Sequence, residues 1–289
     1  MDTQNKELKQ ILGSLHGTPW EHKIQVAPFE GRLPTGFKTE TGIVVGTDLH
    51  PREVVDIAAN HGVRHVVQVG SPEAETELKT SALMLADPEK FLDHPASAIF
   101  CPESVSDAKD REYLGIGIDF KAANEKFGIL ALIQSHLSQF IRRQSFITEL
   151  LLITDELFTN AVFNAPYGHE KNSSGATTNN AKKHGLGGRI FVASDGKRVA
   201  IGCCDPYGSL NVADILHRLQ RCYTEGPDKC MNMGPGGAGI GSYMIYRSSG
   251  SYFGAVKQGY KSFVGSVVPI TTSLRQRMQT PKNIHWLSI

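Results

Sequence analysis

Three polar residues, Glu156, Asn160 and Asn164, stand four positions apart in a stretch that has the composition of a helix. Residues 149–165 are rich in strong helix formers and contain neither glycine nor proline. Side chains four apart share one face of a helix, so the carboxylate and the two carboxamides would form one row. Such a row can hold a proton acceptor and a metal-binding oxygen about one helical turn apart. The alternative is that the row is the solvated face of an amphipathic helix.

A second candidate, Asp205, follows an apolar run that has the pattern of a buried strand. Two such runs, 189–194 and 198–204, flank Asp195-Gly196, and this arrangement predicts a β-hairpin. An acid at the end of a buried strand can accept a hydrogen bond from a ligand's donor group. The alternative is that Asp205 only opens a turn together with Pro206.

Glycines are concentrated between residues 234 and 241, directly before an apolar segment that begins like a helix. Gly237, Gly239 and Gly241 belong to this run, and Ile240 stands between the last two. Backbone N–H groups of such a loop can approach a phosphate closely at the N-terminus of a helix. The run lacks the Gly-Lys-Ser/Thr of a Walker loop, and the pattern around it does not predict the βαβ unit of a dinucleotide fingerprint. A purely structural glycine loop is the alternative.

Taken in order, these features resemble the GHKL superfamily, the Bergerat-fold ATPases shared by gyrase, a class of heat-shock chaperones, histidine kinases and mismatch-repair ATPases. The series is a Glu-x-x-x-Asn helix, a hairpin that ends in Asp205, a glycine-rich loop that leads into a helix, and a closing hairpin at 251–269. The likeness is strongest to the bacterial anti-sigma-factor serine kinases, and it covers residues 125–268.

The resemblance implies a fold and a set of roles. The fold would be a Bergerat-type α/β sandwich, with helices on a mixed sheet, that binds ATP and Mg²⁺. Glu156 would be the general base, Asn160 the Mg²⁺ ligand, and Asp205 the acceptor for the adenine amino group. The other nucleotide-binding positions would be Asn164, Gly208, Gly237, Gly239, Ile240 and Gly241, and the loop glycines would hold the phosphates and form the hinge of a lid.

The activity that the resemblance implies is phosphorylation of a regulatory partner protein on Ser or Thr, or alternatively on His. The partner would be similar to an anti-sigma antagonist or to a response regulator. Two features depart from the family's pattern: Tyr207 and Ser209 stand at glycine positions of its first glycine box, and Asn164 stands where a basic residue often contacts phosphate. A second hypothesis is therefore a non-catalytic adaptor or scaffold in bacterial signal transduction, gated by ATP or ADP. A third is a domain that has only a structural role.

Ahead of this region, residues 41–120 show the alternation of strands and helices that is typical of an α/β domain. Strands are expected at 42–47, 63–70, 96–101 and 113–120, and helices at 51–60 and 72–85. The pattern is compatible with a degenerate receiver domain, for which Asp48 is the plausible phosphoacceptor. The expected division is an extension at 1–40, a small α/β domain at 41–120, a histidine-kinase-like ATP-binding domain at 121–270, and a tail at 271–289.

Residues 122–142 predict one more helix, which precedes the Glu-x-x-x-Asn helix. His136 within it lacks the sequence context of a phosphorylated histidine in a dimerising histidine-kinase helix. His65, in the strand expected at 63–70, is predicted to be a structural histidine with satisfied hydrogen bonds. The apolar side of the helix would be formed by Phe127, Leu130, Leu132, Ile133, Leu137 and Phe140.

The composition is that of an ordinary globular protein: 289 residues are 40% hydrophobic and 20% charged, with a formal net charge of +1. This charge does not favour a nucleic-acid or membrane-surface partner. Five cysteines without metal-site spacing, together with a polar N-terminus that shows no signal peptide, predict a cytoplasmic protein. Arg275, Arg277 and Lys282 are expected to be exposed charges on the tail. The sequence leaves the oligomeric state open and is compatible with a homodimer.

Overall fold

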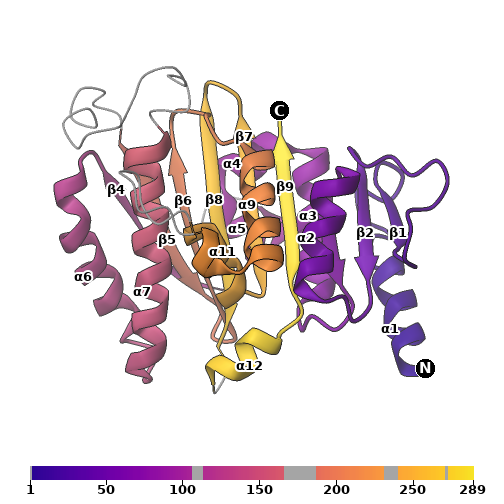
Figure 1. Ribbon diagram of the computed structural model, residues 1–289, viewed down its shortest axis with the longest axis horizontal. Helices are drawn as coiled ribbons and strands as arrows, with labels where there is room; N and C mark the ends of the chain where they lie inside the picture. Colours follow the sequence, from indigo (N-terminus) through magenta and orange to yellow (C-terminus); the bar gives the residue numbers. More distant parts are fainter. Residues whose placement is uncertain (1, 106–112, 166–186, 231–239, 271–272) are drawn as a thin grey trace.

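The strands assemble into one mixed sheet with helices on both of its faces (Figure 1). This is a computed structural model, which describes residues 2–105, 113–165, 187–230, 240–270 and 273–289. The described strands form a nine-stranded sheet in the order β1-β2-β3-β9-β7-β8-β6-β5-β4. The predicted α/β class is therefore confirmed.

The sheet has a parallel part and an antiparallel part, which meet at β9. Strands β1, β2 and β3 are parallel, and β9 runs antiparallel to β3 but parallel to β7. From β7 to β4 every neighbouring pair is antiparallel. The strands are β1 (Gln25–Pro28), β2 (Gly42–Gly46), β3 (His65–Gln68), β4 (Leu114–Phe120), β5 (Gly188–Ser194), β6 (Arg198–Asp205), β7 (Ser251–Lys257), β8 (Lys261–Pro269) and β9 (Asn283–Ser288).

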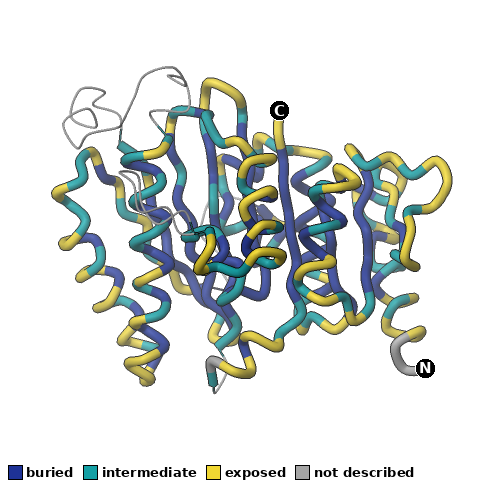
Figure 2. The backbone as a smooth tube through the Cα atoms, in the orientation of Figure 1, coloured by how far each residue is buried: buried dark blue, intermediate teal, exposed yellow. Residues whose placement is uncertain are grey.

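Two hydrophobic clusters, one on each face, hold the helices to the sheet, and Figure 2 shows the strands between them as buried backbone. One face carries α2 (Pro51–His61), α6 (Lys126–Leu137), α7 (Gln144–Thr159), α9 (Val212–Glu225) and α11 (Gly241–Ser248). The other face carries α1 (Asp2–Gly13), α3 (Ala74–Ala86), α4 (Pro88–Asp93) and α5 (Pro95–Phe100). The remaining helices of the described segments are the short α10 (Pro227–Cys230) and α12 (Leu274–Gln279), with 3₁₀ turns at Pro102–Ser104 and Ala123–Glu125 and a π-helical turn at Asn160–Asn164.

The boundaries of α2 show how local sequence determines an element. The His50 backbone N–H donates to the Glu53 carboxylate at 2.7 Å, and the His50 ring accepts from the Arg52 N–H at 3.2 Å. Pro51 takes the first helical position, where a missing N–H costs nothing. Gly62 ends the helix with a left-handed φ of 67°, a conformation that glycine adopts without strain.

The prediction of a strand at 96–101 is wrong, because this part of the chain forms the helix α5 (Pro95–Phe100). Pro95 begins the helix, and Ala98, Ile99 and Phe100 are buried. A short apolar run is compatible with a buried helix as well as with a strand, so periodicity alone does not distinguish them.

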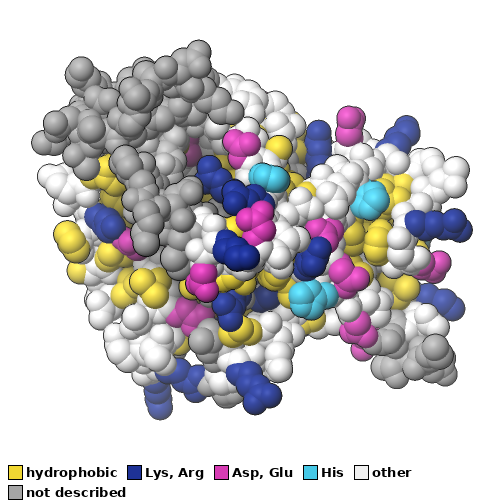
Figure 3. Space-filling view, viewed as in Figure 1, with side chains coloured by type: hydrophobic (Ala, Val, Ile, Leu, Met, Phe, Trp, Pro, Cys, Tyr) yellow, Lys and Arg dark blue, Asp and Glu magenta, His cyan; other side chains and the backbone are white. Residues whose placement is uncertain are grey.

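The apolar side predicted for the helix at 122–142 is also partly wrong. The buried residues of α6 are Ile129, Ile133 and Leu137, whereas Phe127 is 81% exposed and Leu132 is 54% exposed. The helix is apolar around most of its circumference, so its sequence does not indicate which side packs. Figure 3 shows hydrophobic side chains at the surface over α6 and α7.

The segment expected to be an exposed tail contributes β9 to the middle of the sheet. Arg277 and Lys282, which precede the strand, are 3% and 1% exposed, so the expectation that they are solvated is wrong. The Lys282 ammonium donates to the backbone carbonyls of Arg247, Ser249 and Arg277, and these acceptors compensate for the loss of water.

The first three strands and the antiparallel strands belong to one sheet, although the sequence suggests two α/β units. β4, from the end of the unit expected at 41–120, lies at the sheet edge opposite β1 and pairs with β5. Among the described residues, no helix is long and apolar enough to cross a membrane.

Candidate functional site

Glu156, Asn160 and Asn164 form a hydrogen-bonded row, as their spacing predicts. Asn160 Nδ2 donates to Glu156 Oε1 at 3.1 Å, and Asn164 Nδ2 donates to Asn160 Oδ1 at 2.6 Å. α7 ends at Thr159 and continues as the π-helical turn η3 (Asn160–Asn164). Such turns are rare and frequently occur at functional sites.

The row is held in place by the buried side of the same helix. Leu150, Ile153, Leu157 and Phe158 are buried in the cluster that fills this face of the sheet. The Phe158 ring lies 4.6 Å from the ring of Phe120 on β4, measured between centroids. With this side fixed against the sheet, the polar row has a defined orientation.

The Glu156 carboxyl group lies in a partly desolvated place. Burial raises its pKa above the usual value, the hydrogen bond from Asn160 acts in the opposite direction, and the charge of Asp155 raises it further. Lys126 on α6 lowers the pKa, and its Nζ lies 2.5 Å from Asp155 Oδ1. A carboxylate with a raised pKa is a better proton acceptor near neutral pH.

The end of the glycine-rich run packs directly against this carboxylate. Gly241 is the first residue of α11, and a Cβ added to it would lie 1.7 Å from Glu156 Oε1. A side chain therefore cannot be accommodated at this position without moving Glu156. The N-terminus of a helix favours a negative charge, and the Glu156 carboxylate supplies one in this structure.

Two residues beside the carboxylate were not found from the sequence. Burial raises the Tyr252 pKa to about 12, a side-chain hydrogen bond with Ser242, the next residue of α11, acts in the opposite direction, and the Glu156 charge adds to the increase. Tyr252 lies on β7 and reads in the sequence as an ordinary core aromatic. Only the packing of β7 under α11 brings it to Glu156.

Asp205 is the last residue of β6, and its carboxylate is almost fully buried. Its Oδ1 accepts from the Tyr207 backbone N–H at 3.0 Å. Burial raises the pKa of Asp205 to about 6, and hydrogen bonds from the Tyr207 backbone, the Ser262 side chain and the Gly208 backbone limit the increase. The turn expected at Asp205-Pro206 is thus present, and it leaves a buried acceptor at the end of a central strand.

Gly208 is required by the packing of this turn. Its φ is +58°, and a Cβ at this position would lie 2.2 Å from the carbonyl oxygen of Lys257. Its own carbonyl accepts from the Gly259 N–H at 3.0 Å, so the turn is fixed to the β7–β8 hairpin. The glycine has a structural reason to be there, independent of any ligand.

The loop after β6 meets the end of the polar row through Ser209. Its hydroxyl donates to the carbonyl oxygen of Ala165 at 2.5 Å, directly after η3. Ser209 therefore joins the Asp205 loop to the Asn160–Asn164 turn. The sequence identifies Ser209 as a departure but does not indicate this contact.

Gly237 and Gly239 lie outside the described residues, so their expected role stays a prediction. Ile240 directly precedes α11 and packs against the core of this face. The structure thus brings Glu156, Asn160, Asn164 and Gly241 together, and the Asp205–Ser209 loop adjoins them at Ala165.

The donor set determines what the site could hold. Among the described residues, no group of three or more His, Cys, Asp or Glu side chains could bind a metal ion. The row offers one carboxylate and two carboxamide oxygens, which suit a Mg²⁺ ion whose other ligands are phosphate oxygens and water. The residues therefore fit a metal that arrives with a nucleotide better than a resident metal.

No family model and no curated protein matches this chain.

Proposed function

We propose that this protein is a cytoplasmic signalling protein that binds ATP and Mg²⁺ and phosphorylates a regulatory partner protein on Ser or Thr. The alternative acceptor is a His of the partner. The proposal adopts the Bergerat-type ATP-binding arrangement for residues 121–270.

The observation that carries the proposal is the contact of Gly241 with Glu156 beside Asn160. It joins the end of a glycine-rich run, the start of a helix and a carboxylate–carboxamide pair. A helix N-terminus and nearby glycine N–H groups bind phosphate, and the carboxamide oxygen can reach its metal ion.

Each residue has a distinct part in the proposed reaction. Asp205 accepts a hydrogen bond from the adenine amino group, and Asn160 supplies an oxygen to the Mg²⁺ that arrives with the phosphates. Glu156 takes the proton of the partner's hydroxyl group. The oxygen of this hydroxyl attacks the γ-phosphorus of ATP, and ADP leaves. Positioning and charge stabilisation account for most of the catalysis of such transfers.

The architecture around the site supports the same assignment. The antiparallel strands β5, β6, β8 and β7 carry α7, α9 and α11 on one face. α7 and η3 pack against β6, so Asp205 at the end of this strand and the polar row lie on neighbouring elements, as the proposed Bergerat-type arrangement requires.

The second candidate function, a nucleotide-gated adaptor without catalysis, is favoured by one observation. Ser209 ties the loop after β6 to Ala165, in the place where the family has a glycine. This bond restricts movement of the loop after β6 during ATP turnover. A bound nucleotide can still stabilise one conformation of the surface that contacts a partner.

Thermal unfolding with and without nucleotide tests the proposal. We expect Mg-ATP and Mg-ADP to raise the melting temperature, since a ligand at about 100 times its dissociation constant adds about 2.7 kcal/mol. Asp205→Asn should abolish the increase, because the amide presents a donor to the adenine amino group. Asp119→Asn, on the exposed edge of β4, is the matched control and should keep the increase.

A further variant separates the two functions. Glu156→Gln keeps the shape of the site and should keep the nucleotide-induced increase in melting temperature, but it should lose ATP turnover and transfer to the partner. Turnover that is absent already in the wild type would favour the adaptor. A melting temperature that neither nucleotide changes would contradict both functions.

A further inference from the structure

The sheet ends at β4, which has a neighbouring strand on one side only. β4 pairs with β5 over all seven of its residues, in a continuous antiparallel register without a bulge. Among the described residues, no strand pairs with its other side. The N–H and C=O groups of every second residue therefore point away from the sheet. Proteins commonly protect such an edge with proline, lysine or a bulge, and β4 contains none of these.

The sequence of β4 is almost symmetric about its middle residue, Gly117. Outward from this glycine stand an isoleucine on either side, then a glycine or Asp119, and then a large apolar residue at each end. Antiparallel pairing of two β4 strands about Gly117 would place isoleucine opposite isoleucine and Leu114 opposite Phe120, and such apolar cross-strand pairs stabilise a sheet. The one charge of the strand is balanced within the chain, because Arg189 donates to Asp119 at 2.9 Å and 3.0 Å.

α6 lies at the same end of the molecule and contacts β4 (Figure 1). It presents apolar side chains to solvent: Phe127 is 81% exposed and Leu132 is 54% exposed, and Leu114 at the start of β4 is 68% exposed. Residues 127–141 include no Asp, Glu, Lys or Arg. Figure 3 shows hydrophobic side chains at this end of the surface. An uncharged helix beside an unpaired strand is suited to contact with another protein surface.

The charges around this surface indicate which surface it fits. Glu125 precedes α6, and the exposed Arg142 and Arg143 follow it. A twofold axis beside Gly117 that makes β4 antiparallel to a second β4 also makes α6 antiparallel to a second α6. The arginines of each copy then lie toward the Glu125 end of the other, whereas parallel helices would bring four arginines together. The surface is therefore complementary to itself in the antiparallel orientation.

We propose that β4 and α6 form the interface of a homodimer, in which the two sheets join edge to edge through antiparallel β4 strands. The two α6 helices pack against each other over this seam. The partner is a second copy of this chain, and the interface is isologous, since the same residues contribute from both protomers. Strand pairing supplies the backbone hydrogen bonds, and the helices supply the burial of apolar side chains.

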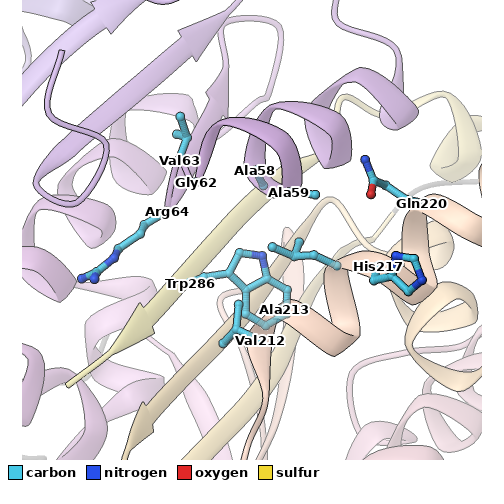
Figure 4. Close-up of a pocket in the computed structure, with 11 residues that line it drawn as sticks. Ala58, Ala59, Gly62, Val63, Arg64, Val212, Ala213, His217, Gln220 and Trp286 are labelled. Carbon is cyan, nitrogen blue, oxygen red and sulfur yellow. The ribbon is translucent and has the colours of Figure 1, made fainter. Parts of the chain in front are cut away.

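Sedimentation velocity from micromolar to submillimolar concentration tests the proposal. We expect the wild type to have twice the mass of one chain. Phe127→Glu combined with Leu132→Glu should raise the dissociation constant by about tenfold or more, because like charges would meet across the twofold axis. Both positions are exposed, so circular dichroism should show an unchanged fold. Ala213→Glu, at an exposed position in the groove between α2 and α9, is the matched control and should leave the dimer intact (Figure 4).

Hydrogen exchange then identifies the strand that pairs. The amides of β4 should exchange more slowly in the wild-type dimer than in the double variant, whereas those of β1, at the opposite edge, should not differ. Arg142→Glu combined with Arg143→Glu should also weaken the dimer, because acids would replace the arginines near the partner's Glu125. The proposal is overturned if the wild type stays monomeric at submillimolar concentration, which would leave the surface to a different protein. It is equally overturned if a dimer forms that only Ala213→Glu dissociates, or in which the β4 amides gain no protection.

Discussion

At the scale of single residues, the contact between Gly241 and Glu156 determines what the site tolerates. The carboxylate oxygen occupies the volume that any Cβ at position 241 would need. We expect Gly241→Ala to displace Glu156 and to lower the free energy of unfolding by about 1–3 kcal/mol, the usual cost of overpacking. Urea denaturation of the wild type and of Gly241→Ala measures the difference in the free energy of unfolding.

Gly128→Ala is the matched control, since a Cβ at this position in α6 meets no atom within 4 Å. In the middle of a helix, alanine should stabilise by about 0.5–1 kcal/mol. Adding Glu156→Ala to Gly241→Ala should recover much of the loss, because the clash disappears. Equal free energies for Gly241→Ala and Gly128→Ala would show that the contact with Glu156 does not constrain the protein.

The residues of the row could be predicted, and their neighbours could not. The i, i+4 spacing of Glu156, Asn160 and Asn164 is a local property, so the sequence gives the face that they share. The approach of Gly241 and the bond from Ser209 to Ala165 join segments that are distant in the chain. Such contacts depend on the order of the strands, which residue patterns do not contain.

At the scale of elements, β9 is held by a buried network of polar side chains, for which the sequence pattern predicts exposed positions. His285 Nε2 lies 2.8 Å from Glu77 Oε2 on α3, and its Nδ1 lies 2.8 Å from the Ser81 hydroxyl. The Ser251 hydroxyl donates to Glu77 Oε1 at 2.6 Å and is joined to Asn283 at 3.1 Å. The network attaches α3 to β7 and β9 beneath the sheet.

We expect Glu77→Gln to lower the free energy of unfolding by about 1–3 kcal/mol, because it removes an acceptor from the buried His285 ring and the Ser251 hydroxyl and leaves polar groups unsatisfied. Burial raises the pKa of Glu77, but contacts with His285, Arg198 and Ser251 outweigh it and hold the pKa below the usual value. The pair therefore stabilises the protein above pH 4.5, and this stabilisation is lost as the pH falls through the lower folded-state pKa. Urea titrations from pH 7 downward measure this dependence.

Glu75→Gln provides the comparison on the same helix. Glu75 is half-exposed and pairs with Lys79 one turn away, so its loss should change the free energy by no more than about 0.5 kcal/mol. The acid-dependent loss of stability should be smaller in Glu77→Gln than in Glu75→Gln. The role assigned to the network would be wrong if the two variants had the same pH dependence.

The elements that the sequence predicts correctly are those with a clear period and local stop signals, such as α2 with its capping residues and Gly62. The helix α5 is not predicted, because a short and mostly apolar run fits either a strand or a helix. β9 was missed because Asn283 and His285 look solvated, although both are fully buried. His65 is structural, as expected, but its hydrogen bonds are not satisfied, since neither ring nitrogen has a partner among the described residues.

At the scale of the whole molecule, the continuous sheet makes the two expected α/β units interdependent. β9 pairs with β3 on one side and with β7 on the other. On the face of α3, α4 and α5, Phe91 of α4 stacks on Phe253 of β7 and lies edge-on to Phe263 of β8. Residues from before and after position 120 therefore share one core, and neither group can lose its structure without exposing apolar surface of the other.

The chain should consequently unfold in one transition, even though proteins of this length often populate intermediates.

The two tryptophans of the chain allow a direct test of this expectation. Trp20 packs among Ile11 and Leu15 at the N-terminal end of the sheet, whereas Trp286 lies at the junction formed by β9. In urea, the emission of the Trp286→Phe variant comes from Trp20 and reports the N-terminal end of the sheet. The emission of the Trp20→Phe variant comes from Trp286 and reports the junction at β9. Each curve should coincide with the loss of circular dichroism in the same variant, because the shared core couples the two places. Two separated midpoints within one variant would instead mean that residues 1–120 and the rest fold as independent units, and that the pairing of β9 with β3 contributes little to the stability of either.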